Sequence, residues 1–197
     1  MTDATPPCVL KIGGSLQDHA ERICSMLLEH DFPVLIVPGG GVYADEVRRS
    51  NVTGSVAHWM AVAAMEQYGW YLSSFGIPTT PALCIPSHPV ILLPYCPLIA
   101  LDPLPHRWEV TSDTIAAWCA HTLHIPLVIL KSVDGIHSGG VLCQRIESPL
   151  PTGDVDPCFI PYVLEHGIPT RVVSGRDTER VFAVLTGHPT TGTTIGF

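Results

Sequence analysis

The chain has 197 residues, of which 46% are hydrophobic and 14% charged, and its formal net charge at pH 7 is −8. This length suits a single domain over residues 1–197 with a full core, and no apolar run approaches the ~18 residues of a membrane span. With ten Lys and Arg against 18 Asp and Glu, we expect neither nucleic acid nor a membrane as a partner.

Strand and helix patterns alternate along the chain. Apolar, partly β-branched runs predict strands at 8–12, 33–37, 90–93, 126–130, 170–173 and 193–195. Helical spacing predicts helices at 16–30, for a turn or more after Gly41, and at 55–75, 114–124, 157–166 and 178–185. Several strands are continuously apolar, which is typical of a mainly parallel sheet covered by helices on both faces. The proline-rich segment 94–108 is predicted to be a long ordered loop or a crossover.

The cysteines and histidines indicate neither disulfides nor a metal site. The seven cysteines are scattered without a C-x-x-C pair, and no basic segment precedes an apolar run at the start. We therefore expect reduced thiols in a cytoplasmic protein. Cys119, His121 and His124 fall on one predicted helix, but residues 119 and 121 point apart and no second ligand cluster accompanies them, so no metal site is predicted.

The first strand leads into a glycine-rich junction, KIGGSL, that begins at Lys11. Ser15 with Asp18 fits a capping box for the following helix. Free N–H groups at a helix N-terminus, approached through Gly13 and Gly14, would bind an anion, and Lys11 adds a positive charge. A tight strand-to-helix turn that happens to hold a lysine explains this stretch equally well.

The second junction repeats this design with Gly39, Gly40 and Gly41 after the strand at 33–37. Both turns would open at the carboxyl edge of a parallel sheet, where ligands bind in such folds. Neither turn matches a Walker A loop or a G-x-G-x-x-G fingerprint, which disfavours P-loop enzymes and Rossmann dehydrogenases.

Two further junctions carry charged residues. In EVTSDTIAAW, either Ser112 or Asp113 could cap the helix that begins near Thr114, whereas Asp113 beside an anion site could instead orient lysines. In LVILKSVDGI, an apolar strand leads to Lys131 and then to Asp134-Gly135, a pair that is common in ordinary turns.

Taken in order, these motifs resemble the amino acid kinase family. The resemblance rests on KIGGS at 11–15, PGGG at 38–41, TSDT at 111–114, SVDGI at 132–136 and the tail SGRDTERVFAVLTGHPTTGTTI, and it covers essentially the whole chain. It implies an α/β fold of the carbamate kinase type, a three-layer αβα sandwich around a central, mainly parallel sheet. It also implies in-line transfer of the γ-phosphoryl group of ATP, with Mg²⁺ on the ATP phosphates.

The resemblance also implies roles for individual residues. Lys11 would stabilise the transferred charge, Asp113 would hold the lysines in place, and Gly13, Gly14 and Ser15 would face the ATP phosphates. The glycines Gly39, Gly40 and Gly41 would contact the acceptor. The nucleotide site would be lined by Ser132, Val133, Asp134, Gly135 and Ile136. Many relatives have a second lysine in a Gly-Met-x-x-Lys segment, but TGDVDPCFIPYVLEHG has none here, so Lys131, the other lysine of the chain, is the candidate for that charge.

The sequence indicates the identity of the acceptor less specifically than it indicates the family. The chain looks like a small branch whose described member phosphorylates an aminomethylfuran-methyl phosphate in methanofuran biosynthesis, giving a diphosphate. By analogy with phosphate-acceptor relatives, His58 would contact the acceptor phosphate, unless it is a hydrogen-bonded core histidine. Arg48, Arg49 and Trp108 are further candidates for binding it.

Other readings stay open. Isopentenyl phosphate, a nucleoside monophosphate or an amino acid could be the acceptor, or the chain could be a nucleotide-binding storage or sensing protein similar to molybdenum storage proteins. The apolar helix predicted at 55–75 favours a homodimer or a higher homo-oligomer.

Overall fold

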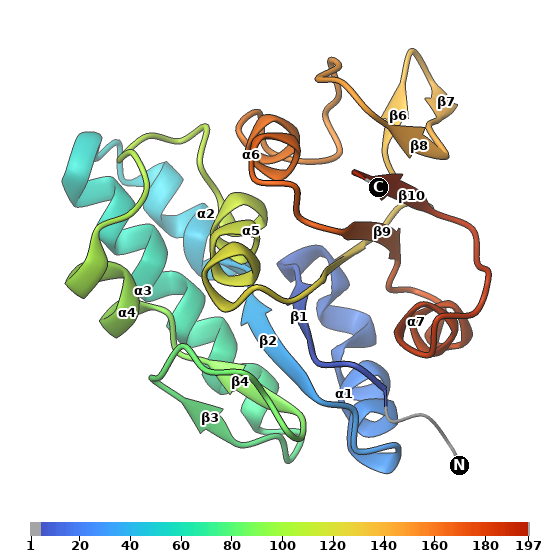
Figure 1. Ribbon diagram of the computed structural model, residues 1–197. Coiled ribbons are helices and arrows are strands. Elements are labelled where there is room, and N and C mark those ends of the chain that lie inside the picture. The colour runs from blue at the N-terminus through green and yellow to red at the C-terminus, as the bar shows by residue number, and fades with distance from the viewer. Residues whose placement is uncertain (1–4, 197) are drawn as a thin grey trace.

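The computed structural model describes residues 5–196, and its centre is an eight-stranded sheet (Figure 1). The strand order is β3-β4-β2-β1-β5-β9-β10-β8. The strands are β1 (Cys8–Ile12), β2 (Val34–Pro38), β3 (Thr79–Thr80), β4 (Val90–Leu92), β5 (Leu127–Lys131), β8 (Arg145–Ile146), β9 (Thr170–Ser174) and β10 (Thr193–Ile195). Pairing is parallel from β3 to β9, and β10 pairs with β9 antiparallel, so the expected mainly parallel sheet is confirmed.

Helices cover the sheet in the arrangement expected for a three-layer sandwich. They are α1 (Ala20–Glu29), α2 (Gly41–Arg49), α3 (Gly54–Ser73), α4 (Tyr95–Leu101), α5 (Ser112–Leu123), α6 (Phe159–Glu165) and α7 (Thr178–Leu185). The core on one side of the sheet includes residues of α5 and α6, and the core on the other side includes residues of α1 and α7. Helix α3 contributes to both. A small hairpin, β6 (His137–Ser138) with β7 (Val141–Leu142), lies outside the main sheet.

Alternation along the central strands decides which side chains face which layer. Val9 of β1 belongs to the core under α5, whereas its neighbour Leu10 belongs to the core under α1 and α7. Because side chains alternate across a strand, the next odd-numbered residue, Lys11, faces the α5 layer. Leu127 and Ile129 of β5 also lie in the α5 layer, so Lys131 follows them on that side.

Three local predictions differ from the structure. The helix predicted at 16–30 starts as a 3-10 turn, η1 (Gly14–His19), and the capping box of Ser15 and Asp18 is not formed, because Gly13 precedes the turn and has no side chain to cap it. The segment 94–108 is not a loop throughout, since it contains α4. Pro97 lies in the first turn of α4, where proline is tolerated. The sequence also did not predict the two-residue strands β3, β6, β7 and β8, because two residues are too few to show a strand pattern.

No helix within residues 5–196 is both long enough and apolar enough to cross a bilayer.

Candidate active site

Two glycine turns meet at the carboxyl edge of the sheet. A Cβ built on Gly14 would lie 2.1 Å from the Cα of Gly41, and one on Gly39 would lie 3.0 Å from the Cα of Gly13. Glycine is therefore required because the turns after β1 and β2 pack backbone against backbone; Gly41 also has a φ of +54°. Both η1 and α2 begin here, and the first N–H groups of a helical turn have no partner within that turn. The two turns thus bring donors for an anion together.

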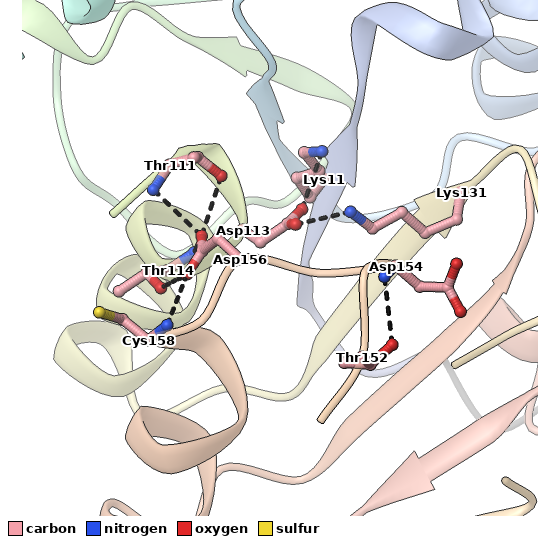
Figure 2. A network of polar contacts seen from close by, with 9 residues as sticks. All are labelled: Lys11, Thr111, Asp113, Thr114, Lys131, Thr152, Asp154, Asp156 and Cys158. Carbon is pink, nitrogen blue, oxygen red and sulfur yellow. Dashed lines mark hydrogen bonds and ion pairs between the residues drawn. The ribbon is translucent and has the colours of Figure 1, made fainter. Parts of the chain in front are cut away.

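Beside these turns, one aspartate holds both lysines of the chain (Figure 2). The Asp113 carboxylate lies 2.9 Å from Lys11 Nζ through Oδ1 and 2.6 Å from Lys131 Nζ through Oδ2. The Oδ1 contact is an ion pair without the angles of a hydrogen bond, whereas Lys131 donates a hydrogen bond to Oδ2. We call Lys11, Asp113 and Lys131 the lysine–aspartate triad. Asp113 thus contacts both lysines, and its role in orienting them for a reaction stays a prediction.

Burial makes the electrostatics of the triad strong. Burial alone would raise the pKa of Asp113, but the charges of Lys11 and then Lys131 outweigh it and lower that pKa from 3.8 to about 2. The pKa of Lys131 is lowered, chiefly by burial and then by the charge of Lys11, against the opposing effect of Asp113. With Asp113 ionised and both lysines protonated, the triad has a net charge of +1 at the edge where the glycine turns open.

The N-terminus of α5, which carries Asp113, is capped by a residue from another segment. Neither Ser112 nor Asp113 caps it, which corrects the first interpretation of that junction. The Asp156 carboxylate accepts hydrogen bonds from the backbone N–H and the hydroxyl of both Thr111 and Thr114, at 2.6–3.1 Å (Figure 2). Burial raises the pKa of Asp156 while the bonds from Thr114 oppose that rise. The segment without the expected second lysine therefore supplies the cap that positions Asp113.

A cavity of about 150 Å³ adjoins the triple-glycine turn. Its walls are small and apolar residues of α2, α3, α5 and the segment before α5, and its polar lining includes Arg48, His58, Arg107, Thr111 and Ser112. Residues 5–196 contribute no acidic side chain to this lining. Trp108 also lines it, and the Arg48 guanidinium carbon lies 5.2 Å from the centre of a Trp108 ring, a cation–π contact.

Some of the residues predicted to bind the acceptor line this cavity, and others do not. Gly40, Gly41, Arg48, His58 and Trp108 line the cavity. Gly39 lies just before it, packed on Gly13, and Arg49 does not line it. Arg49 pairs with Glu46 at 2.7 Å on the exposed side of α2. His58 is buried, yet no described residue hydrogen-bonds its ring, so the geometry does not support the alternative of a hydrogen-bonded core histidine.

A second, shallower groove lies near Lys131. It is lined by Ser132, Val133, Asp134, His137, Ser174, Arg176, Asp177 and Arg180. Of the residues expected at the nucleotide site, Ser132, Val133 and Asp134 are therefore present. Gly135 and Ile136 are buried, because a Cβ on Gly135 would meet Thr193 and the N–H of Ile136 donates to the Thr193 hydroxyl. Ser15 is exposed at the start of η1.

Sequence patterns did not single out several residues at these sites. Arg107 lines the cavity, and Arg176 and Arg180 line the groove. Arg180 forms an ion pair with Asp134, while no carboxylate among residues 5–196 pairs with Arg176. The signal for both was the SGRDTER run, where basic residues follow the glycine after β9. Asp156 had no signal, since only the fold brings it to α5.

Comparison with known proteins finds relatives over nearly the full length. A scan against protein-family models gives no match. The chain is 30% identical over 200 aligned residues to [5-(aminomethyl)furan-3-yl]methyl phosphate kinase of Methanocaldococcus jannaschii, covering 91% of this chain and 93% of that protein.

Solved structures share the fold at lower identity. Uridylate kinase of Archaeoglobus fulgidus matches with a TM-score of 0.70 and 17% identity, over 96% of this chain and 100% of the other. An isopentenyl phosphate kinase structure matches with a TM-score of 0.65 and 18% identity, over 95% and 99% of the two chains.

Proposed function

Because the chain belongs to the amino acid kinase family, we propose that it transfers the γ-phosphoryl group of ATP to a small phosphate monoester. The whole chain, residues 1–197, acts as one kinase domain. The first candidate acceptor is the aminomethylfuran-methyl phosphate named for its Methanocaldococcus relative, which would become a diphosphate. The observation that carries the proposal is the lysine–aspartate triad beside two glycine turns.

The triad supplies what phosphoryl transfer requires. Such transfer depends mainly on positioning and on neutralising charge at the moving group, with little covalent chemistry from the protein. Lys11 and Lys131 are the cations, and Asp113 holds both ammonium groups in place before substrate arrives, so no reorganisation is needed during the reaction. The N–H groups at the starts of η1 and α2 add donors for the phosphate oxygens. The pairing of Lys131 with Asp113 favours an enzyme over a storage protein that has lost the second charge.

The groove beside Lys131 fits a nucleotide. Ser132, Val133 and Asp134 would hold its base and sugar, and the Arg176 guanidinium is available for its phosphates. Within residues 5–196 no group of three or more His, Cys, Asp or Glu side chains could hold a metal ion. Mg²⁺ would therefore bind through phosphate oxygens and water, as it commonly does, and would neutralise phosphate charge.

The lining of the cavity fits a small phosphate monoester. Arg48, Arg107 and His58 offer donors for an anionic group, and arginine suits bidentate phosphate contacts. Apolar walls, including Val62, Met65 and Ile115, suit a small organic body.

The test is to measure ATP turnover with a panel of acceptors. Turnover is monitored as ADP release, and the product is identified by ³¹P NMR. The panel holds the aminomethylfuran-methyl phosphate, isopentenyl phosphate, UMP, glutamate and aspartate. We expect turnover with a phosphate monoester and a diphosphate product. Faster turnover with an amino acid would contradict the choice of acceptor, and ATP binding without turnover of any acceptor would favour the storage alternative.

Helix α3 favours a homodimer or a larger homo-oligomer. Its outward residues Val56, Met60 and Trp70 are apolar and 38–61% exposed, and Ile99 and Leu101 of the neighbouring α4 are 48% and 61% exposed. Exposed apolar patches of this kind mark interaction sites. We expect light scattering at micromolar concentration to give at least a dimer mass, and Trp70→Glu to lower it. Val141→Glu, at a position 70% exposed on β7, is the control; a monomeric parent would contradict the proposal.

A further inference from the structure

Two histidine rings stack beside the acceptor cavity. His58 of α3 and His106 of the segment after α4 have ring centroids 4.3 Å apart and ring planes inclined by 18°. The Trp59 ring contacts both edge-on, with centroids 4.8 Å from His58 and 5.1 Å from His106. Forty-eight residues separate the two histidines, so this arrangement exists only in the folded chain.

One ring of the stack is held by hydrogen bonds at both nitrogens. His106 Nε2 lies 2.7 Å from Asp102 Oδ1, and its Nδ1 lies 2.8 Å from the Ser55 hydroxyl oxygen. Since a carboxylate can only accept, the Nε2 atom of His106 carries a hydrogen. Asp102 ends α4 with a φ of 43°, and Ser55 is in the first turn of α3. His106 therefore ties the end of α4 to the start of α3 in one orientation.

The other ring is not held in this way. His58 is 9% exposed and lines the cavity, and no residue within 5–196 hydrogen-bonds its ring nitrogens. Neither ring nitrogen is among the fully buried side-chain atoms that lack a partner, so both are accessible and available to hydrogen-bond a ligand. The orientation of the His58 ring is set by its stacking contact with His106 and its edge-on contact with Trp59.

The charges around His58 disfavour its protonation while the cavity is empty. Burial lowers the pKa of His58, and His106 lowers it further, whereas Asp102 opposes both. Arg48 of α2 and Arg107 of the segment before α5 line the same cavity and are also cationic. An anionic acceptor would reverse this balance, because it would lie against His58 and both arginines.

We propose that His106 is a positioning residue for the acceptor, held by Asp102 and Ser55 so that it fixes the plane of His58 toward the phosphate of the incoming monoester. This inference rests on the proposed function for the identity of the acceptor. It adds a second histidine, an aspartate and a serine to the acceptor site, none of which lines the cavity itself. The segment 102–106 thereby determines acceptor affinity from behind the cavity wall.

The experiment compares His106→Phe, Asp102→Asn and Ser55→Ala with the parent, and His58→Ala as the reference for loss of the contact. His106→Phe keeps an aromatic face against His58 but loses both hydrogen bonds. Because each lost hydrogen bond is worth about 1 kcal/mol, we expect the KM for aminomethylfuran-methyl phosphate to rise about fivefold in Ser55→Ala and about 30-fold in His106→Phe. Asp102→Asn, whose amide oxygen can still accept from His106, should raise it by less than about fivefold, and the KM for ATP should be unchanged in all three variants. His88→Ala, at an exposed position of the 81–89 segment, is the control and should match the parent.

A second readout does not depend on turnover. In ¹³C,¹⁵N-histidine NMR of the full chain, we expect His106→Phe to raise the titration midpoint of His58 and to change its tautomer ratio. Unchanged acceptor KM together with unchanged His58 signals in His106→Phe would overturn the inference. So would equal changes in the KM for ATP and for the acceptor. If the parent turns over no acceptor, the proposed function fails, and the NMR measurement alone then decides whether His106 positions His58.

Discussion

The lysine–aspartate triad and the cavity beside the triple-glycine turn are neighbours but are built differently. The side chains of Lys11, Asp113 and Lys131 are 6%, 4% and 14% exposed and are paired with one another. In the cavity, the Arg48 side chain is 52% exposed and its partner Asp45 is 58% exposed. The triad comes from two central strands and one helix start, whereas the cavity is formed by α2, α3, α5 and the segment before α5. The triad is thus buried and internally paired on the central sheet, whereas Arg48 of the cavity and its partner are half exposed on a helix.

The largest effect is expected from Asp113→Asn, which would leave two lysine charges facing each other in a buried site. Breaking a buried ion pair at one partner costs about 3–5 kcal/mol. We expect urea unfolding at pH 7 to show a loss of that size, with loss of activity.

The pH dependence gives a second check on Asp113. Its pKa is lowered from 3.8 to about 2 by the two lysines, so its stabilisation is complete above pH 3.8 and is lost as the pH falls through 2. The difference in unfolding free energy between the parent and Asp113→Asn should therefore shrink below pH 3.8.

The control for Asp113→Asn is Glu147→Gln, which breaks an exposed pair with Arg145 and should lower the unfolding free energy by less than about 1 kcal/mol. Equal costs for the two variants would remove the distinction between triad and surface.

Next in size are the two lysines. Lys11→Met and Lys131→Met each remove one cation from the site while Asp113 keeps one partner, so stability should fall less than in Asp113→Asn. Because lost transition-state stabilisation by a single group costs about 10²–10³ in rate, we expect kcat to fall by that factor in each.

The lysine experiment is measured as ADP release under saturating substrates. Arg22→Met, which removes an exposed cation on α1, is the control and should leave kcat unchanged. Turnover of Lys131→Met within a few-fold of the parent would mean that the second charge comes from elsewhere.

Asp156 tests whether the triad depends on its support. Asp156→Ala leaves the N–H groups and hydroxyls of Thr111 and Thr114 without their acceptor at the start of α5. Because buried donors are left unsatisfied, we expect a loss of about 2–3 kcal/mol in thermal or urea unfolding. Asp177→Ala removes an ordinary cap, that of α7, and should cost about 1 kcal/mol. Equal losses would show that Asp156 is no more than a helix cap.

The smallest effect is expected from a comparison of two neighbouring arginines of α2, Arg48, which lines the cavity, and Arg49, which does not. Arg48→Ala should raise the acceptor KM about tenfold, since a hydrogen bond to a charged group is worth about 1.5 kcal/mol or more. Arg49→Ala should stay within about twofold, because Arg49 pairs with Glu46 outside the cavity. The KM for ATP should be unchanged in both. Equal shifts for the two variants would contradict the assignment of Arg48.

The sequence by itself determined the mainly parallel sheet and the two glycine turns. These features are local, because a strand buried on both faces shows as a short continuous apolar run and a glycine turn shows its composition. The side of the sheet that Lys11 and Lys131 face was left open by the sequence, and it follows by alternation only once Val9 and Ile129 are placed in the α5 layer. The choice between Arg48 and Arg49 was also within reach, since Arg48 lies four residues after Ala44 and shares its helix face.

Only the tertiary structure decided which distant groups meet. Asp156 caps α5 from 42 residues beyond Thr114, Lys131 pairs with Asp113 of α5, and His106 stacks on His58 across 48 residues. The strength of each contact depends on burial, because burial lowers the local dielectric. A low dielectric strengthens the attraction between paired charges and raises the cost of a polar group without a hydrogen-bond partner. Periodicity tells which face a residue occupies, but what lies opposite that face is set by packing between elements far apart in the chain.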